Sequence, residues 1–428
     1  MLQPVAPSST KLGIIGLGYV GLPLALTAGE SGLTVLGFDA DPAKIIDLKA
    51  GRSYIRHIGP ERVASQVAQG RLAATTDLAR IRECGTVILC LPTPLDAHLQ
   101  PDLSYIEQTC RDIAPHLAAD SLVILESTTW PGTTDEVVRP LLEAHGRRLG
   151  VDLFLAYSPE REDPGNGRFT TRTIPKLVGG CDGPSAERAL ALYRHFIDTV
   201  IPVVDARTAE AAKLLENVFR GVNIALVNEL KTILDRMGID VFAVIRAAAT
   251  KPFGFMPFYP GPGLGGHCIP LDPYYLSWKA REFGLPARFI ELAGEINRSM
   301  PAWVVAKVQD ALNDQGKAVK GSRILLLGVA YKANVDDQRE SPSLELMHLL
   351  EAKGASVSFH DPHLAVILPN REYGAFAGRA SVPLGPGYDL FLLATAHQAV
   401  TPAAILAQGV PVVDTRGYLP PGPLVIPA

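Results

Sequence analysis

Short apolar runs alternate with amphipathic stretches in the first half of the chain. Residues 11–16 form an apolar run that leads into a glycine-rich segment, a helical pattern follows to about residue 32, and residues 34–38 form the next run. Further strands are predicted at 86–91, 122–126, 153–157 and 176–179, with helical patterns between them. Alternation of strands and helices in this way is typical of a doubly wound parallel sheet.

The pattern changes between residues 205 and 237, where apolar residues occupy nearly every face of one uninterrupted helical stretch. About 32 residues would make roughly 48 Å of helix at 1.5 Å per residue. We expect such a helix to join two domains and to pack against a second subunit, which predicts a homodimer or a higher homo-oligomer. Helical segments continue to about residue 314, interrupted by a loop rich in Gly and Pro at 251–273.

A second α/β unit follows, with a strand at 323–327, a helix at 343–353 and a strand at 356–360. Its second strand ends in Asp361, as the second strand of the first unit ends in Asp39. It lacks a G-x-G-x-x-G pattern, so we expect it to bind a different ligand. The sequence therefore predicts an α/β fold with two Rossmann-like doubly wound domains, joined by a long central helix and a helical middle domain. The domains are placed at 1–204, 205–317 and 318–428.

Composition narrows the classes of function. Apolar residues make up 47% and charged residues 20% of the chain, which fits well-packed domains. A formal charge of −4 gives no reason to expect nucleic acid or an anionic membrane as a partner. Five cysteines without a C-x-x-C pair indicate a reducing compartment. No apolar run reaches the roughly 18 residues needed to cross a bilayer, and the glycines at 16, 18 and 21 interrupt the one stretch that resembles a signal peptide. We expect a soluble, cytoplasmic protein.

The glycine-rich segment predicts a dinucleotide site. Gly16, Gly18 and Gly21 form G-x-G-x-x-G between a predicted strand and a predicted helix. Such glycines let the backbone approach a pyrophosphate whose charge is stabilised by the helix N-terminus. Asp39, 18 positions beyond Gly21, could accept hydrogen bonds from the adenosine ribose and would repel a 2′-phosphate, which favours NAD over NADP.

The loop at 251–273 is the second chemical signal. In its segment 258–273, four glycines at 261, 263, 265 and 266 could leave backbone N–H groups free to form an anion-binding nest. Cys268 follows them, where a thiol could be exposed with a lowered pKa; the alternative is a small buried residue. His267 is not favoured as its base, since sequence neighbours often point apart. A metal site is not expected, because no second Cys/His pair has ligand spacing.

Two further groups stand out. Lys213 and Asn217 are four residues apart on the predicted long helix, hence on one face. A lysine there needs a role or a partner, and an internal salt bridge with Glu210 or Glu216 is as compatible with the spacing as a catalytic role. Glu160 follows a predicted strand, at the edge where α/β sheets hold ligands; a solvated charge cluster is the competing interpretation.

These motifs together resemble the UDP-glucose/GDP-mannose dehydrogenase family over almost the whole chain. The resemblance is carried by seven segments: 16–21, Leu-Pro-Thr-Pro at 91–94, Glu-Ser-Thr-Thr at 126–129, Ser-Pro-Glu at 158–160, Ala-Glu-Ala-Ala-Lys at 209–213 with Asn217, the cysteine loop at 263–272, and Ala-Tyr-Lys at 330–332 with Asp-Gln-Arg-Glu-Ser at 337–341.

The resemblance implies a four-electron oxidation of a sugar C6 alcohol by two NAD⁺, through a thiohemiacetal and a thioester on the cysteine. The catalytic roles it implies belong to Cys268, Lys213, Asn217, Glu160, Asp272 and Thr128. Contacts to NAD are implied for Gly16, Gly18, Tyr19, Val20, Gly21, Asp39, Thr93, Thr128 and Glu162. Contacts to the UDP-sugar are implied for Glu160, Arg161, Lys213, Asn217, Phe258, Tyr259, Gly261, Gly263, Gly265, Lys332 and Arg339. The three domains would serve NAD binding, dimerisation with catalysis, and UDP-sugar binding.

Two positions indicate the branch of the family. Arg161 replaces an aromatic residue that is typical of the UDP-glucose branch, and Leu271 replaces a lysine. The segments 158–166 and 173–176 resemble the UDP-N-acetylhexosamine branch, with UDP-GlcNAc as the first choice and UDP-ManNAc, UDP-GalNAc or UDP-glucose as alternatives. A two-electron 3-hydroxyacid-type dehydrogenase shares the Rossmann start and long helix but needs no nucleophilic cysteine. A non-catalytic NAD-binding protein would not need Lys213, Glu160 and Cys268 together.

Overall fold

The computed structural model describes residues 11–55, 58–96, 100–162, 169–266, 268–370 and 372–428. His267 lies outside the described residues, and of Cys268 only the backbone is described. The chain forms two compact units, which are treated separately below. Unit 1 comprises Met1–Glu216 and Tyr274–Leu285, and unit 2 comprises Asn217–Pro273 and Pro286–Ala428.

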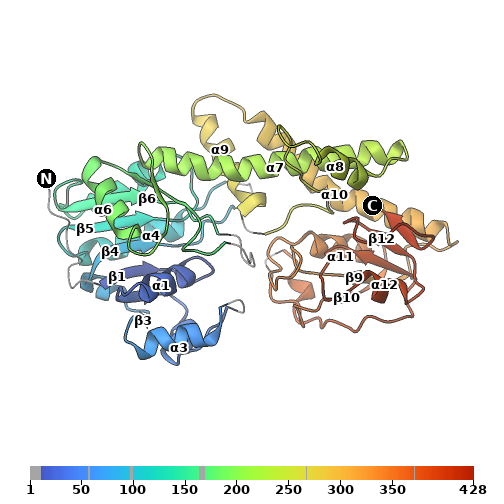
Figure 1. The fold of residues 1–428 in the computed structure, drawn as a ribbon, viewed down its shortest axis with the longest axis horizontal. Coiled ribbons are helices and arrows are strands. Elements are labelled where there is room, and N and C mark those ends of the chain that lie inside the picture. Colours follow the sequence, from blue (N-terminus) through green and yellow to red (C-terminus); the bar gives the residue numbers. More distant parts are fainter. Residues whose placement is uncertain (1–10, 56–57, 97–99, 163–168, 267, 371) are drawn as a thin grey trace. The chain divides into compact units, whose positions relative to one another are not determined.

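Unit 1 is built on an eight-stranded sheet with the order β3-β2-β1-β4-β5-β6-β7-β8 (Figure 1). The strands are β1 (Lys11–Ile15), β2 (Val35–Phe38), β3 (Leu72–Thr75), β4 (Cys84–Leu89), β5 (Ser121–Leu125), β6 (Leu153–Tyr157), β7 (Lys176–Gly180) and β8 (Val200–Pro202). The strands predicted from apolar runs are confirmed to within two residues. The short strands β3 and β8 were not predicted.

One strand pair departs from the predicted parallel arrangement. β6 and β7 are antiparallel, whereas the other neighbours in this sheet are parallel. Parallel neighbours need a crossover connection, usually a helix. The connecting residues 158–162 and 169–175 contain no helix, so the chain turns back along the sheet edge and places this connection beside the ends of β5 and β6.

Helices cover both faces of this sheet. They are α1 (Gly21–Glu30), α2 (Pro42–Lys49), α3 (Pro60–Ala68), α4 (Ser104–Ile113), α5 (Arg139–Glu143) and α6 (Gly183–Tyr193), with short helical segments of other types at Leu78–Glu83, Ala114–His116 and Thr134–Val138. Leu12, Ile14 and Val35 belong to one core cluster with side chains of α1 and α6. The alternate strand residues Val87 and Val123 are also buried, as expected when both faces are covered.

The predicted long helix is confirmed as α7 (Ala206–Arg236). It is followed by α8 (Val241–Ala248), α9 (Cys268–Glu282) and α10 (Arg288–Asn313). The predicted loop at 251–273 therefore ends earlier than expected, because Cys268 already begins α9. Pro270 lies in the first turn, where backbone N–H groups have no partner within the helix, so proline is tolerated there. The prolines at 270 and 273 suggested a loop, but the helix accommodates both of them.

Unit 2 contains a five-stranded parallel sheet with the order β10-β9-β11-β12-β13 (Figure 1). Its elements are β9 (Arg323–Leu327), α11 (Pro342–Ala352), β10 (Ser356–His360), a turn at Gly374–Phe376, β11 (Leu390–Leu393), α12 (Pro402–Leu406), β12 (Val412–Asp414) and β13 (Val425–Pro427). Buried residues form one core with α10 and α11 on one face and a second with α12 on the other. The predicted α/β class with two Rossmann-like sheets and a helical middle is confirmed.

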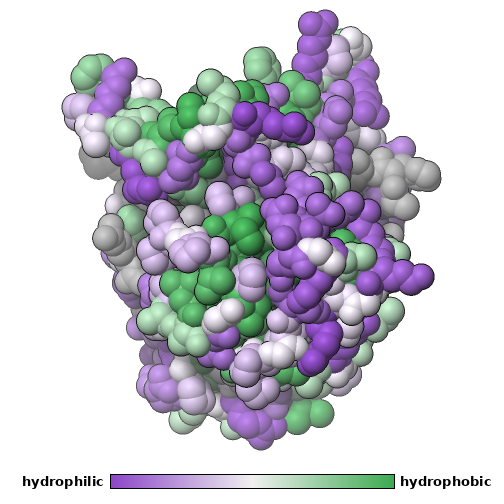
Figure 2. All heavy atoms as spheres, turned by 90° about the vertical axis from the view of Figure 1, so that its right-hand side faces the viewer, coloured by the Kyte–Doolittle hydropathy of each residue, from purple (hydrophilic) through white to green (hydrophobic). Residues whose placement is uncertain are grey.

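The face drawn in Figure 2 has a mixed character, with hydrophobic residues gathered near its centre and hydrophilic residues around them. Among the described residues, no helix combines the length and apolar character required to traverse a bilayer.

Candidate functional site

The glycine-rich turn of unit 1 uses its three glycines in different ways. Gly16 has φ +91°, and a Cβ there would lie 2.2 Å from the carbonyl oxygen of Cys90. A Cβ on Gly21 would lie 1.9 Å from the carbonyl oxygen of Gly16. Gly18 has no heavy atom within 4 Å of its Cβ position. Gly16 and Gly21 are thus required by the chain itself, while Gly18 leaves open space at the N-terminus of α1, which fits a pyrophosphate.

Asp39 stands at the end of β2, as predicted, and its carboxylate lies in a cradle of donors. Oδ2 accepts from the backbone N–H of Leu17 and from Nζ of Lys44, both at 2.9 Å. Oδ1 accepts from the backbone N–H of Asp41 at 3.0 Å. The side chain is 10% exposed. The carboxylate therefore joins the glycine turn to the start of α2 at the place where a ribose hydroxyl would be recognised.

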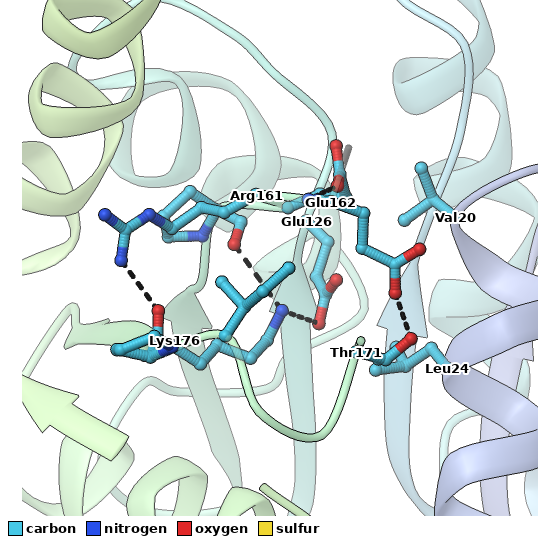
Figure 3. Close-up of a pocket in the computed structure, with 11 residues that line it drawn as sticks. Val20, Leu24, Glu126, Arg161, Glu162, Thr171 and Lys176 are labelled. Atoms are coloured by element: carbon cyan, nitrogen blue, oxygen red, sulfur yellow. Dashed lines mark hydrogen bonds and ion pairs between the residues drawn. The ribbon is translucent and has the colours of Figure 1, made fainter. Parts of the chain in front are cut away.

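A small, partly open pocket lies beside this turn (Figure 3). Val20, which directly precedes α1, and Leu24 of α1 line one side, and the β6–β7 connection with Glu160, Arg161 and Glu162 lines the other. Figure 3 shows the Glu162 carboxylate directed toward Val20 and Thr171, whose hydroxyl donates to it. Burial raises the pKa of Glu162 to about 7, and the Glu160 carboxylate adds to the rise. Near neutral pH, Glu162 can therefore either donate or accept a hydrogen bond.

A buried ion pair forms the base of this pocket. Nζ of Lys176 lies 3.0 Å from Oε1 of Glu126, and the two side chains are 10% and 1% exposed. Tyr193 donates its hydroxyl proton to the same carboxylate, and Lys176 also approaches the carbonyl oxygen of Pro159 at 3.5 Å. The pair thus holds the residue before Glu160. Neither Glu126 nor Lys176 was predicted as a site residue, although both stand in segments that carry the family resemblance.

Lys213 is buried on α7, and the structure pairs it with Glu160. Its Nζ donates to the carbonyl oxygen of Glu160 at 2.5 Å and lies 3.8 Å from the carboxylate. The suggested pairing with Glu210 or Glu216 was wrong. Glu210 accepts hydrogen bonds from Gly132 and Thr134, and Glu216 pairs with Arg161 at 2.7 Å.

Glu160 is not part of a solvated charge cluster, since its side chain is only 14% exposed. Arg161, expected to contact the substrate, is bonded within the protein: besides its ion pair with Glu216, it donates to the carbonyl oxygen of Pro175 at 2.7 Å. The burial of Glu160 and the bonds of Arg161 thus hold these two residues in place beside the pocket.

The remaining predicted cofactor residues lie on the loops that follow the strands. Thr93 is buried after β4, and its carbonyl oxygen accepts from the hydroxyl of Tyr275 at 2.6 Å. Thr128 is half-buried after β5. Tyr19 is partly buried against the core of unit 1. The two threonines thus follow neighbouring strands at the carboxyl edge of the sheet, where α/β proteins bind ligands.

In unit 2, Asn217 and Asp272 form a buried pair. Nδ2 of Asn217 donates to Oδ2 of Asp272 at 2.6 Å, and the two residues are 4% and 3% exposed. Asp272 stands on α9, one turn after Cys268, which begins that helix. Asn217 stands on α7, one turn after Lys213.

The glycines of the 258–266 loop allow close approaches instead of leaving all their N–H groups free. The N–H of Gly261 donates to Oδ1 of Asn228 at 3.0 Å, and that of Gly266 donates to the carbonyl oxygen of Arg339 at 3.0 Å. A Cβ on Gly261 would lie 2.5 Å from Nη1 of Arg416, and one on Gly265 would lie 2.7 Å from Cβ of Tyr331. The predicted nest is therefore wrong for the N–H groups of Gly261 and Gly266, because tertiary neighbours accept their hydrogen bonds.

The other predicted substrate residues of unit 2 differ in exposure. Phe258 packs edge-on against Phe219 with 5.6 Å between ring centroids, while Tyr259 is 51% exposed. Gly263 has φ +137°, a value that favours glycine. Lys332 is half-buried in the turn after β9. Arg339 forms an ion pair with Asp337 at 2.6 Å.

Comparison with known proteins agrees with this architecture in each region. The UDP-glucose/GDP-mannose dehydrogenase family matches with its NAD binding domain over residues 10–197, its central domain over 207–299 and its UDP binding domain over 325–421. The chain belongs to this family. Its cofactor is therefore NAD, and it is an oxidoreductase that acts on a UDP-sugar.

Relatives of this dehydrogenase differ in the sugar named for them. The chain is 38% identical over 389 residues to a UDP-N-acetyl-D-glucosamine 6-dehydrogenase of Pseudomonas aeruginosa, with 90% of each chain covered. It is 37% identical over 358 residues to a UDP-N-acetyl-D-mannosamine dehydrogenase of Pyrococcus horikoshii, with 83% of this chain and 84% of the relative covered. A solved structure of UDP-D-ManNAc dehydrogenase from Pyrococcus horikoshii matches with a TM-score of 0.87, 32% identity and 97% of each chain covered.

Two cations of this dehydrogenase, the half-buried Arg416 and the buried Lys231, were not predicted. Arg416 follows β12, donates from Nε to the carbonyl oxygen of Ala394 at 2.7 Å and packs against Gly261. Lys231 on α7 is 3% exposed, and its Nζ lies 3.2 Å from the carbonyl oxygen of Thr415. Burial lowers the pKa of both groups, to about 10 for Arg416 and about 7 for Lys231. The contact between Arg416 and the glycine loop would have marked it as a site residue, but the two meet only in the folded chain. The sequence near Arg416 therefore gave no signal.

The charge of Lys231 should make stability depend on pH. Burial, followed by the nearby Arg416, lowers its pKa from 10.5 to about 7, so the unfolded chain binds this proton more tightly. The resulting loss of stability is complete below pH 7 and disappears as the pH rises toward 10.5. Lys231→Met should therefore raise the melting temperature by several degrees at pH 6 and change it little near pH 10.

Melting curves of both proteins at pH 6, 8 and 10 measure this effect. Lys307→Met is the matched control, because Lys307 forms an ion pair with Asp235 at 2.6 Å and is 24% exposed. Lys307→Met should not raise the melting temperature at any of these pH values. A gain for Lys231→Met of equal size at pH 6 and pH 10 would contradict the role of the lysine charge.

Proposed function

We propose that this dehydrogenase oxidises the C6 hydroxyl of a UDP-N-acetylhexosamine to the carboxylate, with UDP-GlcNAc as its best substrate. The branch assignment is supported by Arg161 and Leu271, which depart from the UDP-glucose pattern. It is also supported by similarity to relatives named for N-acetylated sugars. Four electrons leave the sugar in two hydride transfers, for which NAD⁺ held by unit 1 would supply the acceptor.

The single observation that carries the chemistry is the buried ammonium of Lys213 beside Glu160. A cation and a carboxylate held together in a water-poor site suit a reaction in which an oxyanion forms and protons move. We assign Lys213 and Asn217 to stabilising the negative charge that develops on the C6 oxygen. Glu160 and Asp272 are assigned to proton transfer and activation of water, and Thr128 to the same catalytic group.

The proposed nucleophile is the thiolate of Cys268. The first oxidation converts the alcohol to an aldehyde and releases a proton. The thiolate sulfur then bonds to the aldehyde carbon, and the oxygen is protonated to give a thiohemiacetal. The second oxidation removes the remaining hydride and the hydroxyl proton, which leaves a thioester. Water adds to the thioester carbon and the C–S bond breaks, releasing the carboxylate and regenerating the thiolate.

We assign the UDP part of the substrate to unit 2. Lys332 and Arg339 are the cationic residues that we assign to it, together with Phe258, Tyr259 and the glycines of the 258–266 loop. Arg416 joins this group because its guanidinium packs against Gly261, and a half-buried guanidinium suits a diphosphate. The assignment expects anion recognition by side chains, since the N–H groups of Gly261 and Gly266 are already bonded.

The substrate assignment is tested by comparing four UDP-sugars. We expect kcat/KM for UDP-GlcNAc to exceed that for UDP-ManNAc, UDP-GalNAc and UDP-glucose by about tenfold or more, as expected where polar groups of a site match one sugar only. NADH formation at saturating NAD⁺ measures each value, and KM for NAD⁺ with each sugar serves as the control. A higher kcat/KM for UDP-glucose would show that the branch assignment is wrong while the reaction class stands.

We also propose that the enzyme is a dimer. Phe219, Leu226, Leu230 and Ile233 are between 38% and 51% exposed, and their spacing along α7 places them on one face of the helix. An apolar stripe of this kind on a soluble protein is typical of a subunit interface.

Sedimentation velocity at micromolar concentration should therefore show a species of at least twice the chain mass of 45.8 kDa. Leu226→Asp should shift it toward the monomer, because a charge would have to be buried at the interface. A fully active monomer of the unmodified enzyme at that concentration would contradict the proposal.

A further inference from the structure

The turn after β9 in the second sheet has the same backbone geometry as the turn after β1 in the first. The aspartate beside it, Asp361, has a different role from Asp39. Gly328 follows β9 with φ +85°, as Gly16 follows β1 with φ +91°. Gly328 donates to the carbonyl oxygen of His360, as Gly16 donates to that of Phe38. Asp361 thus ends β10 at the place that Asp39 holds after β2. The local backbone is the same, so the difference lies in what surrounds the carboxylate.

The Asp361 carboxylate is enclosed by donors. Oδ2 accepts from the N–H groups of Val329 and Ala330 at 2.8 Å and 3.0 Å. Oδ1 accepts from the N–H groups of His363 and Leu364 at 2.8 Å and 3.0 Å. Burial disfavours its charge, but the hydrogen bond from His397 and those from the backbone donors outweigh burial and lower the pKa of Asp361. Asp361 is 4% exposed, so it anchors the turn and does not face a ligand.

His397 extends this anchor. The residue is 1% exposed, and its Nε2 lies 3.2 Å from Oδ2 of Asp361. Its Nδ1 accepts a hydrogen bond from the backbone N–H of Asn334 at 3.0 Å. A backbone N–H can only donate, so Nδ1 carries no proton and the ring proton is on Nε2, facing the carboxylate. One imidazole therefore joins Asp361 to a residue of the turn after β9.

Asn334 is held in an unusual conformation by these contacts. Its φ is +63°, in the left-handed region, and its side-chain oxygen accepts from the N–H of Gln398 at 2.9 Å. The start of the same turn is tied to the same loop, because the hydroxyl of Thr395 donates to the carbonyl oxygen of Ala330 at 2.7 Å. The segment 329–334 is thus fastened at both ends to residues 395–398. Lys332 stands between the two points of attachment.

We propose that His397 is a positioning residue for UDP-sugar binding, which holds the segment 329–334 in the conformation that presents Lys332 to the substrate. This inference rests on the role proposed for Lys332. Asp361 fixes the tautomer of His397, and His397 fixes Asn334. Asp361, which stands where the ribose-binding Asp39 stands in the first sheet, would thereby help to shape the binding site for the UDP-sugar.

Two conservative variants separate the halves of the imidazole. In His397→Asn the amide oxygen can replace Nδ1 as the acceptor for the Asn334 N–H, but the bond to Asp361 is lost. In His397→Gln the amide nitrogen can replace Nε2 as the donor to Asp361, but the bond to Asn334 is lost. Calorimetry with UDP as the probe, on the full-length enzyme, measures the dissociation constant.

His397→Gln should weaken UDP binding about tenfold, as expected when a buried hydrogen bond is lost, and raise KM for the UDP-sugar by a similar factor. His397→Asn should stay within about threefold of the unmodified enzyme. KM for NAD⁺ and kcat at saturation should not change in either variant. Hydrogen exchange of the Asn334 amide should accelerate in His397→Gln alone.

A second pair of variants tests the same attachment of segment 329–334 at Asn334. This residue is exposed, so its substitution should not prevent folding. Asn334→Gly keeps the left-handed conformation without strain, whereas Asn334→Ala does not. UDP should bind more weakly to Asn334→Ala than to Asn334→Gly. Equal binding of UDP by both members of each pair, within twofold of the unmodified enzyme, would overturn the inference. Lys332→Ala tests the underlying assignment separately: unchanged UDP binding in that variant would remove the proposed role of Lys332 whatever the His397 variants do.

Discussion

Cys268→Ser should lower the rate of carboxylate formation by several orders of magnitude, while the unmodified enzyme forms two NADH for each sugar consumed. An unperturbed thiol is a few per cent thiolate at neutral pH and is strongly nucleophilic, whereas a serine hydroxyl is scarcely ionised. Serine keeps the shape of the side chain but is a far poorer nucleophile and a far poorer leaving group. The variant should therefore stall as a slowly hydrolysed ester or release a trace of aldehyde.

Counting NADH per UDP-sugar, with mass spectrometry of the sugar product, measures this outcome directly. Cys181→Ser is the matched control, because burial raises the pKa of the Cys181 thiol and makes it a poor nucleophile. It should keep the ratio of two. One NADH per sugar in the unmodified enzyme, or full activity of Cys268→Ser, would leave a two-electron dehydrogenase as the only reading.

The second large effect concerns the choice of cofactor. The unmodified enzyme should strongly prefer NAD⁺, because the Asp39 carboxylate would repel a 2′-phosphate. In Asp39→Ser, the N–H groups of Leu17 and Asp41 and the ammonium of Lys44 lose their common anion. These three donors suit a phosphate. We expect kcat/KM for NAD⁺ to fall by about 10- to 100-fold, the value of a hydrogen bond to a charged group, and kcat/KM for NADP⁺ to rise.

Lys44 provides the control for this switch. Adding Lys44→Met to Asp39→Ser should remove most of the gain with NADP⁺, since the ammonium is then absent. Lys44→Met alone should retain the preference for NAD⁺. Both cofactors are compared in all four proteins by initial rates at a fixed, saturating UDP-sugar concentration. A preference of the unmodified enzyme for NADP⁺ would refute the role of Asp39.

The order of the elements was readable from the chain because it depends on local patterns. Apolar runs located β1, β5, β6, β9 and β10, and the uninterrupted pattern after residue 205 located α7. The antiparallel β7 was identified as a strand, but its direction was missed, since direction depends on the connection and not on the strand itself. The start of α9 was missed because prolines in a first turn resemble a loop.

Within the site, the residue types were predictable and their partners were not. The spacing of Gly16, Gly18 and Gly21, and of Lys213 and Asn217, follows from the local geometry of a turn and a helix. The partner of Lys213 is 53 residues away, and the nearer glutamates on the same helix bond elsewhere. Gly261 and Gly266 were recognised as exceptional, yet the reason is a close approach by Arg416 and a bond to Arg339.

The sequence by itself determined most of the elements, the NAD turn and the chemical groups available, because each depends on residues within a few positions of one another. Only the tertiary structure decided which donor meets which acceptor: Lys176 with Glu126, Asn217 with Asp272, and His397 with both Asp361 and Asn334. Residues far apart in the chain become partners only when strand ends and helix faces meet. Burial then makes each such bond strong and an unpaired group costly, a condition that no local pattern contains.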